Sequence, residues 1–326
     1  MSHNATNTAE DGKQGRGFSL RWVLHSPLAL PLIGLIVVSI LMGFASENFF
    51  SVGNIMNVLR QVSIVAILAV GMTFVILTGG IDLSVGAVMA LSGTIAAGLM
   101  VNMGLPGWVG LLAGLGVGVG LGIFNGVMVA WGRMPAIIVT LATMGIARGL
   151  GLLYSGGYPI SGIPSWISWF GIGRIGIVPV PVIAMVIVYA LAWVLLQRTP
   201  FGRHVYAIGG NELAAKLSGV KTQMVKLTVY AISGLTSAFA ALILTGRLMS
   251  GQPNAGVGFE LDAIAAVVLG GTAIAGGRGL ILGTLIGAVL LGILNNGLNL
   301  MGINPYLQDV IKGLIILLAI YIGREW

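Results

Sequence analysis

The sequence predicts an all-α, polytopic membrane protein with about ten transmembrane helices. Of its 326 residues, 57% are hydrophobic and only 8% are charged, whereas a soluble domain carries roughly 25% charged residues to face water. The apolar residues gather into runs of about 20, the length that a helix needs to cross a bilayer. Little chain remains between the runs, so we expect no large soluble domain.

The apolar runs follow one another along a single transmembrane domain, 28–323. A hydrophilic segment, 1–27, precedes this domain, and residues 324–326 follow it. Each run is expected to form one membrane helix, because only a helix satisfies its own backbone hydrogen bonds in lipid. The runs are 28–45, 58–78, 81–101, 107–131, 136–154, 179–197, 227–249, 261–276, 280–301 and 307–323.

The positions of Lys and Arg predict an orientation with both ends inside. Cytoplasmic loops of membrane proteins carry an excess of these residues. A cytoplasmic tail 1–27 places the loop 198–226 and the end 324–326 on the same side. That loop is the most basic connection of the chain, and its positive residues are Arg198, Arg203, Lys216, Lys221 and Lys226.

The fourth apolar run carries a glycine at every fourth position. On a helix this spacing draws one stripe without side chains, and such stripes let two membrane helices approach closely. We therefore expect a packing seam, with a functional hinge as the alternative. The glycines are Gly110, Gly114, Gly118, Gly122 and Gly126.

A partial internal echo joins the two halves of the chain. GGIDLSVG at 79–86 and GGRGLILG at 276–283 share the pattern GG-x-x-L-x-x-G, and LGIFN at 121–125 resembles LGILN at 291–295. The offsets of the two pairs differ, so no single duplication aligns both. Internal repeats are common in transporters, but glycine-rich helices also resemble one another by composition, and both explanations stay open.

Several chemistries are excluded by what the sequence lacks. It has no Cys, three His and no G-x-x-x-x-G-K-[ST] phosphate loop, so we predict no catalytic residue, no metal site and no cofactor in this chain. The net charge of +7 follows the membrane orientation rather than a nucleic-acid partner. The chain is therefore not expected to be an enzyme.

Asp82 is the most conspicuous polar residue, because it lies with Ser84 between two apolar runs and follows the pair Gly79 and Gly80. A carboxylate at membrane depth costs at least about 2.5 kcal/mol and needs partners or water. One interpretation is structural: the glycines end one helix and Asp82 caps the next. The other is a broken-helix site that lines a substrate path.

Asparagines also lie inside predicted spans, at Asn125, Asn295 and Asn296. An amide both donates and accepts hydrogen bonds, so these side chains are candidates to bind a hydroxyl-rich solute along a translocation path. They can equally hold neighbouring helices together.

The loop 198–226 divides into two parts. Residues 202–210 are expected to be strand-like or irregular. Asn211 is then placed to cap a short helix, with Glu212 in its first turn and Gly219 at its end. Such a short helix is marginal alone and becomes sensible if it docks into a partner; a merely solvated basic loop is the alternative.

Taken together, the motifs resemble the ribose-type permease family, the membrane subunits of ATP-binding-cassette importers for pentoses and related sugars. The resemblance covers nearly the whole chain after the tail. The motifs are AVGMT at 69–73, GGIDLSVG at 79–86, AIGGN at 207–211, ELDAIAAVVLGG at 260–271 and LNNG at 294–297.

The resemblance implies that a coupling helix in 212–219 contacts an ATPase subunit. It is similar to the pattern E-A-A-x-x-x-G, but imperfectly: either Leu213 stands in place of Glu, or Glu212 fits and the glycine comes one residue late. The coupling residues that the resemblance implies are Gly209, Gly210, Asn211, Glu212, Ala214, Ala215 and Gly219.

The resemblance also implies the partners and the location. These are a cytoplasmic ATPase subunit, a periplasmic sugar-binding protein and a second permease chain, identical or related, in the lipid bilayer of the bacterial inner membrane. The expected activity is import of a monosaccharide, ribose or a related pentose, by alternating access. The alternative is an ion- or proton-coupled secondary sugar transporter that uses Asp82, Glu260, Asp262 or Asp309.

Overall fold

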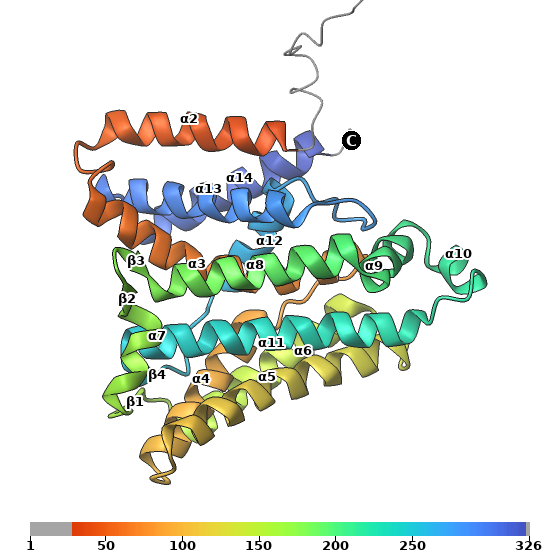
Figure 1. Ribbon diagram of the computed structural model, residues 1–326, viewed down its shortest axis with the longest axis horizontal. Helices are drawn as coiled ribbons and strands as arrows, with labels where there is room; N and C mark the ends of the chain where they lie inside the picture. The colour runs from red at the N-terminus through yellow and green to blue at the C-terminus, as the bar shows by residue number, and fades with distance from the viewer. Residues whose placement is uncertain (1–27, 324–326) are drawn as a thin grey trace, which may run out of the picture.

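The computed structural model describes residues 28–323, which form a bundle of helices that run side by side (Figure 1). The predicted cytoplasmic segments 1–27 and 324–326 lie outside the described residues. Helices α9 and α10 lie at one end of the bundle, and the four short strands lie at the other. We refer to these as the α9–α10 end and the strand end.

The elements confirm a mainly helical fold and follow one another in the order α2 (Ala29–Ala45), α3 (Val52–Leu77), α4 (Val85–Val101), α5 (Gly107–Ala130), α6 (Ala136–Ser155), β1 (Ile160–Ser161), η1 (Ser165–Ile167), α7 (Ser168–Ile172), β2 (Arg174–Ile175), β3 (Val178–Pro179), α8 (Val180–Arg198), α9 (Pro200–Gly210), α10 (Glu212–Leu217), α11 (Thr222–Leu248), β4 (Ser250–Gly251), α12 (Phe259–Leu269), α13 (Ile281–Leu300) and α14 (Pro305–Gly323).

Six helices in the described part of the chain are long and apolar enough to cross a membrane, and two more apolar helices, α2 and α4, have 17 residues each. The six are α3, α5, α6, α8, α11 and α13. Repeated long apolar helices make this a multi-pass membrane protein. The count of ten spans and the orientation with both ends inside stay predictions.

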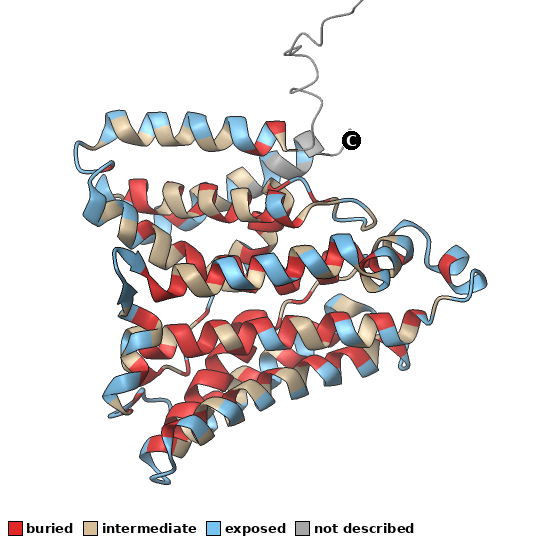
Figure 2. Cartoon of the chain, in the orientation of Figure 1, coloured by how far each residue is buried: buried red, intermediate tan, exposed pale blue. Residues whose placement is uncertain are grey.

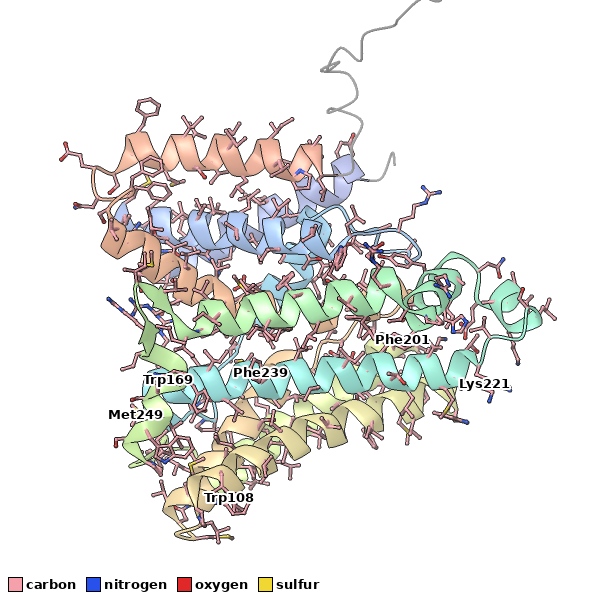
Figure 3. The ribbon with its side chains drawn as sticks, viewed as in Figure 1. Trp108, Trp169, Phe201, Lys221, Phe239 and Met249 are labelled. Carbon is pink, nitrogen blue, oxygen red and sulfur yellow. The ribbon has the colours of Figure 1, made fainter. Side chains whose placement is uncertain are left out.

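Two small antiparallel ribbons depart from the predicted all-α fold. Ile160 pairs with Gly251, which joins β1 to β4, and Arg174 pairs with Pro179, which joins β2 to β3. Each ribbon has only two residues per strand. They close the strand end of the bundle, where the exposed Trp108 and Trp169 also lie (Figure 3).

The core is built around α3 and α11. From Val62 to Leu77 nearly every α3 residue is buried, and α11 packs against α3, α4 and α5. Helix α2 lies at the edge of the bundle and is mostly exposed along its length (Figure 2). An apolar helix with an exposed apolar face is what a lipid environment permits.

The predicted glycine seam on α5 is confirmed. Each of its five glycines is buried, and they pack first on α4 and then on α11. A Cβ atom at Gly114 would lie 2.9 Å from the Ser92 carbonyl oxygen, and one at Gly126 would lie 2.8 Å from the Leu227 Cα. The seam therefore holds three helices at backbone contact, as small residues do in membranes.

Two predicted spans are shorter than their apolar runs. Helix α4 begins at Val85, so residues 81–84 are not helical, and α12 ends at Leu269, so residues 270–276 are not helical either. A glycine pair precedes the first stretch and begins the second: Gly79 has φ +79° and Gly271 has φ +84°, a conformation in which the chain leaves a helix. Hydrophobicity alone does not reveal these breaks.

Candidate functional site

The first candidate region is the connection between α8 and α11. The prediction of a strand-like or irregular segment at 202–210 is wrong, because α9 is a helix. Thr199 accepts a hydrogen bond from the Gly202 N–H at 3.3 Å, and Pro200 occupies the first turn. Both are helix-start signals, and they outweigh the glycines further along.

The predicted short helix after α9 is confirmed as α10. The Asn211 side chain accepts a hydrogen bond of 2.9 Å from the Ala214 N–H, and Gly219 follows the helix with φ +87°. Lys226 on α11 pairs with Glu212 at 2.7 Å. Helix α10 is thus fixed to the start of α11 by an ion pair as well as by its caps.

Helix α10 projects from the bundle (Figure 1) and exposes two leucines. Leu213 is 67% exposed and Leu217 is 81% exposed, whereas Ala215 on the opposite face is buried. Sequence reasoning singled out neither leucine as a contact residue. Their spacing of four in a polar loop is the signal that a small apolar face is available there.

Three backbone segments meet where α9 ends, in what we call the glycine junction: Leu77 at the end of α3, Gly209 on α9, and Gly277 with Gly279 in the loop after α12. The Gly277 N–H donates a hydrogen bond of 3.0 Å to the Leu77 carbonyl oxygen. A Cβ atom on Gly209 would collide with both of these groups. The Tyr206 hydroxyl donates to the Gly279 carbonyl oxygen at 3.0 Å.

The junction also brings the two GG motifs of the internal echo together. A Cβ atom at Gly276 would lie 2.8 Å from the Gly79 nitrogen and 3.1 Å from the Gly209 Cα. Whether the echo is a true repeat stays open. Burial raises the pKa of the Tyr206 hydroxyl above its ordinary value, at which a tyrosine is already protonated at neutral pH.

Asp82 lies in a buried polar cluster. Its carboxylate accepts hydrogen bonds from the Ser84 N–H at 3.0 Å, the Ser84 hydroxyl at 2.6 Å and the Ser233 hydroxyl of α11 at 2.7 Å. Only 2% of Asp82 is exposed. The residue sits before α4, as predicted, but it bonds the helix cap Ser84 rather than the free N–H groups of the first turn.

Asn125 extends the same cluster to two more helices. Its amide donates to the Ser84 hydroxyl at 3.0 Å and accepts from the Thr143 hydroxyl of α6 at 2.6 Å. Asp82, Ser84 and Asn125 are therefore brought together, with Gly80 beside them against the Tyr230 hydroxyl. Because their polar groups bond one another, this cluster has the geometry of a clasp between α4, α5, α6 and α11.

Asn295 and Asn296 on α13 separate. Asn296 exchanges two hydrogen bonds of 2.8 Å with Asn54 of α3, which is the helix-clasping arrangement. Asn295 instead lines a cavity, and its Oδ1 atom is buried without a hydrogen-bond partner in the described part of the chain. Of the two, only Asn295 has an amide oxygen without a partner among the described residues, as a group that binds a solute needs.

The cavity has a volume of about 210 Å³ and lies between five helices, α3, α11, α12, α13 and α14. It combines polar side chains with an apolar wall. The lining residues are Gln61, Val62, Ile64, Val65, Leu244, Arg247, Phe259, Asp262, Ala288, Leu291, Gly292, Asn295, Asn299, Gln308 and Lys312.

Lys312, in the wall of this cavity, makes two ion pairs. The Lys312 ammonium of α14 lies 3.5 Å from Asp262 of α12 and 3.5 Å from Asp309. Within residues 28–323 no group of three His, Asp or Glu side chains is arranged to hold a metal ion. The site therefore offers hydrogen-bonding groups to a solute, without a cluster of acids for a cation.

A multi-pass bundle with a projecting helix at one end and a polar cavity within it defines a membrane transport protein. Its residues 54–320 match the model of the family "Branched-chain amino acid transport system / permease component", and the chain belongs to this family of transport permeases. The match spans most of the described residues.

Individual relatives are similar over nearly their whole length. The ribose import permease protein RbsC of Bacillus subtilis is 52% identical over 297 residues, which cover 90% of this chain and 92% of the relative. RbsC of Escherichia coli K12 is 47% identical, with 95% and 97% covered. The D-allose transport system permease protein AlsC of the same bacterium is 37% identical, with 96% and 95% covered.

Proposed function

We propose that this chain is the membrane-spanning permease subunit of an ATP-binding-cassette importer that carries a monosaccharide, ribose first, across the bacterial inner membrane. The observation that carries the proposal is the identity of 47–52% to ribose import permeases over at least 90% of the chain. Relatives that import D-allose, fructose and L-arabinose support a monosaccharide substrate. The secondary-transporter alternative has no such support.

A separate ATPase subunit supplies the energy and docks on α10. Two features support this: the chain has no phosphate loop of its own, and α10 presents Leu213 and Leu217 to the outside of the bundle. The Asn211 cap and the Glu212–Lys226 ion pair hold this face in position. The α9–α10 end is then the cytoplasmic end, which the basic residues of 198–226 favour.

Substrate arrives at the opposite, strand end of the bundle. There a periplasmic sugar-binding protein docks, and a second permease chain completes the transporter. The predicted orientation supports this position of the strand end. It places both ends of the chain, on either side of the ten predicted spans, in the cytoplasm, and the α9–α10 end lies on the same side. Trp166 and Trp169, each 48% exposed, sit at this end, as membrane-interface tryptophans do.

Motion reaches the permease through the glycine junction. When ATP closes the ATPase dimer, α10 shifts and carries α9 with it, because only Asn211 separates the two helices. Gly209 and Tyr206 touch the end of α3 and the loop after α12. A small displacement at α10 therefore moves two parts of the bundle, which is how packed elements amplify a local change.

The site residues divide by role in this proposal. Asn295 faces the solute, and Asn296 fixes α13 to α3. The helices around the path are held together by Asp82, Ser84 and Asn125. The break between α3 and α4, which leaves room for Asp82 and Ser84, is formed by Gly79 and Gly80. No residue of this chain performs covalent chemistry.

Purification of the transporter from native membranes tests the proposal. The tagged chain is expected to bring down an ATPase subunit, and proteoliposomes made with the sugar-binding protein are expected to take up labelled ribose in a vanadate-sensitive manner. Uptake that instead follows a proton or sodium gradient, without an ATPase, would contradict the proposal.

A further inference from the structure

We propose that the cavity between α3, α11, α12, α13 and α14 is a transient binding site for one uncharged monosaccharide, with Asn295 as its principal contact. The inference rests on the proposed function and adds where in this chain the sugar binds.

The position of the cavity fits a sugar that enters from the strand end. The α11 residues that line it, Leu244 and Arg247, come from the last turns before β4. Asn299 belongs to the end of α13, and Gln308 to the start of α14. The cavity thus lies toward the strand end, away from the glycine junction and α10.

Its size fits a small solute. Pockets for drug-sized ligands measure roughly 300–1,000 Å³, and this cavity measures about 210 Å³. Water occupies about 30 Å³ per molecule, so the space equals about seven waters. A single sugar ring with its hydroxyls matches that volume, whereas a peptide or a disaccharide exceeds it.

The chemistry of the wall fits a polyol. The Asn295 Oδ1 atom is buried and unpartnered, so a sugar hydroxyl that donates to it would satisfy a group that is costly to leave unpaired. Arg247 adds a donor for other hydroxyls. Phe259 and Leu291 supply an apolar wall for the C–H face of the ring.

The charges disfavour a cation as the ligand. The Lys312 ammonium already lies between Asp262 and Asp309, at 3.5 Å from each, so neither carboxylate is left to bind a cation alone. Gln308 is held by hydrogen bonds to Asn299 at 2.9 Å and to the Ile303 carbonyl oxygen at 2.8 Å. These contacts hold Gln308 in place at the rim of the cavity.

The test is ribose uptake and ATP hydrolysis, measured in the same proteoliposomes with the complete transporter and its sugar-binding protein. For Asn295→Leu, which removes a hydrogen bond to the sugar, and for Asn299→Phe, which places a ring in the lining of the cavity, we expect uptake to fall roughly tenfold, while ATP hydrolysis stays within about twofold of wild type. Asn299 is exposed, but it accepts a hydrogen bond from Gln308, so thermal unfolding of both variants is measured to show that they fold. Asn102→Ala, at the exposed end of α4, is the matched control.

Unchanged uptake in both variants would overturn the inference, and so would uptake and ATP hydrolysis that fall together. Greater protection of the wild-type chain against heat by ribose 5-phosphate than by ribose would also overturn it, because an anionic ligand is then the preferred one. A wild-type transporter that carries no monosaccharide contradicts the proposed function and this inference with it; intact wild-type uptake with unaffected variants contradicts the cavity alone.

Discussion

The hydroxyl of Tyr206 on α9 donates a hydrogen bond of 3.0 Å to the carbonyl oxygen of Gly279 in the loop between α12 and α13. This bond links the helix that leads into α10 to a segment 73 residues further along the chain. Together with Gly209 against Gly277, it makes the loop after α12 part of the glycine junction, which we propose carries motion from α10 into the bundle.

Removing the Tyr206 hydroxyl is expected to weaken coupling more than folding. Tyr206→Phe deletes one hydrogen bond, worth about 0.5–1.5 kcal/mol, and keeps the ring. We expect a lower ratio of ribose transported to ATP hydrolysed, measured in proteoliposomes. Tyr306→Phe, at a position 81% exposed, is the control, and an equal ratio in both variants would show that the bond has no part in coupling.

The glycine junction gives a matched pair of substitutions on one helix. Gly209→Ala places a Cβ atom against the Leu77 carbonyl oxygen and the Gly277 nitrogen, and overpacking of this kind costs about 1–3 kcal/mol. Gly210→Ala meets open space and is expected to be neutral or to stabilise by about 0.5–1 kcal/mol. Thermal unfolding of the purified permease measures both.

The two variants could instead lose the same amount of stability. The requirement for glycine at both positions would then come from the geometry of the helix and not from backbone contact at the junction. A Gly210→Ala variant that is less stable than Gly209→Ala would mean that Gly210, and not Gly209, is the α9 residue in backbone contact at the junction.

Asp82→Ala is expected to destabilise the permease by about 2–4 kcal/mol, because the Ser84 N–H and the Ser233 hydroxyl lose their buried acceptor. Thr143→Val removes one hydrogen-bond donor to the Asn125 carbonyl oxygen. It should lower the stability of the permease by about 1–2 kcal/mol. Asp309→Ala, whose side chain is 75% exposed, should cost less than about 1 kcal/mol. Thermal unfolding with a denaturant series ranks the three.

An Asp82→Ala variant that folds with wild-type stability yet transports no ribose would argue against the clasp. It would favour the path-lining alternative for Asp82.

Leu217→Asp is expected to separate the permease from its ATPase. Burying one leucine contributes about 1.5–3 kcal/mol, so the substitution should weaken the complex at least about tenfold. Co-purification measures it. Lys221→Ala changes an exposed residue of the same loop (Figure 3) and should retain the ATPase; retention of the ATPase by both variants would show that α10 is not the docking element.

The sequence predicts features whose signals are local. Asn211, Glu212 and Gly219 define α10 within nine residues, and the glycine spacing on α5 defines a seam without knowledge of its partner. The prediction for 202–210 was wrong because it did not use the helix start at Thr199 and Pro200. Glycine permits many conformations, so a helix start is the stronger signal.

Features that depend on distant contacts were beyond prediction from one sequence. Asn125 and Asn295 both sit in apolar runs with the same neighbours, a Leu-Gly-Ile stretch, yet one joins a satisfied cluster and the other faces a cavity. Their roles depend on which of several helices surround each amide. The cavity itself has walls from five helices, and no segment of the chain encodes it alone.

ATP-dependent ribose uptake is the most direct test of the central claim. The wild-type chain, its ATPase subunit and the sugar-binding protein are reconstituted, and labelled ribose inside the vesicles is counted with and without ATP on the ATPase side. We expect accumulation against the ribose gradient with ATP and none with ADP. Equal uptake under both conditions, or none for any monosaccharide, would contradict the account.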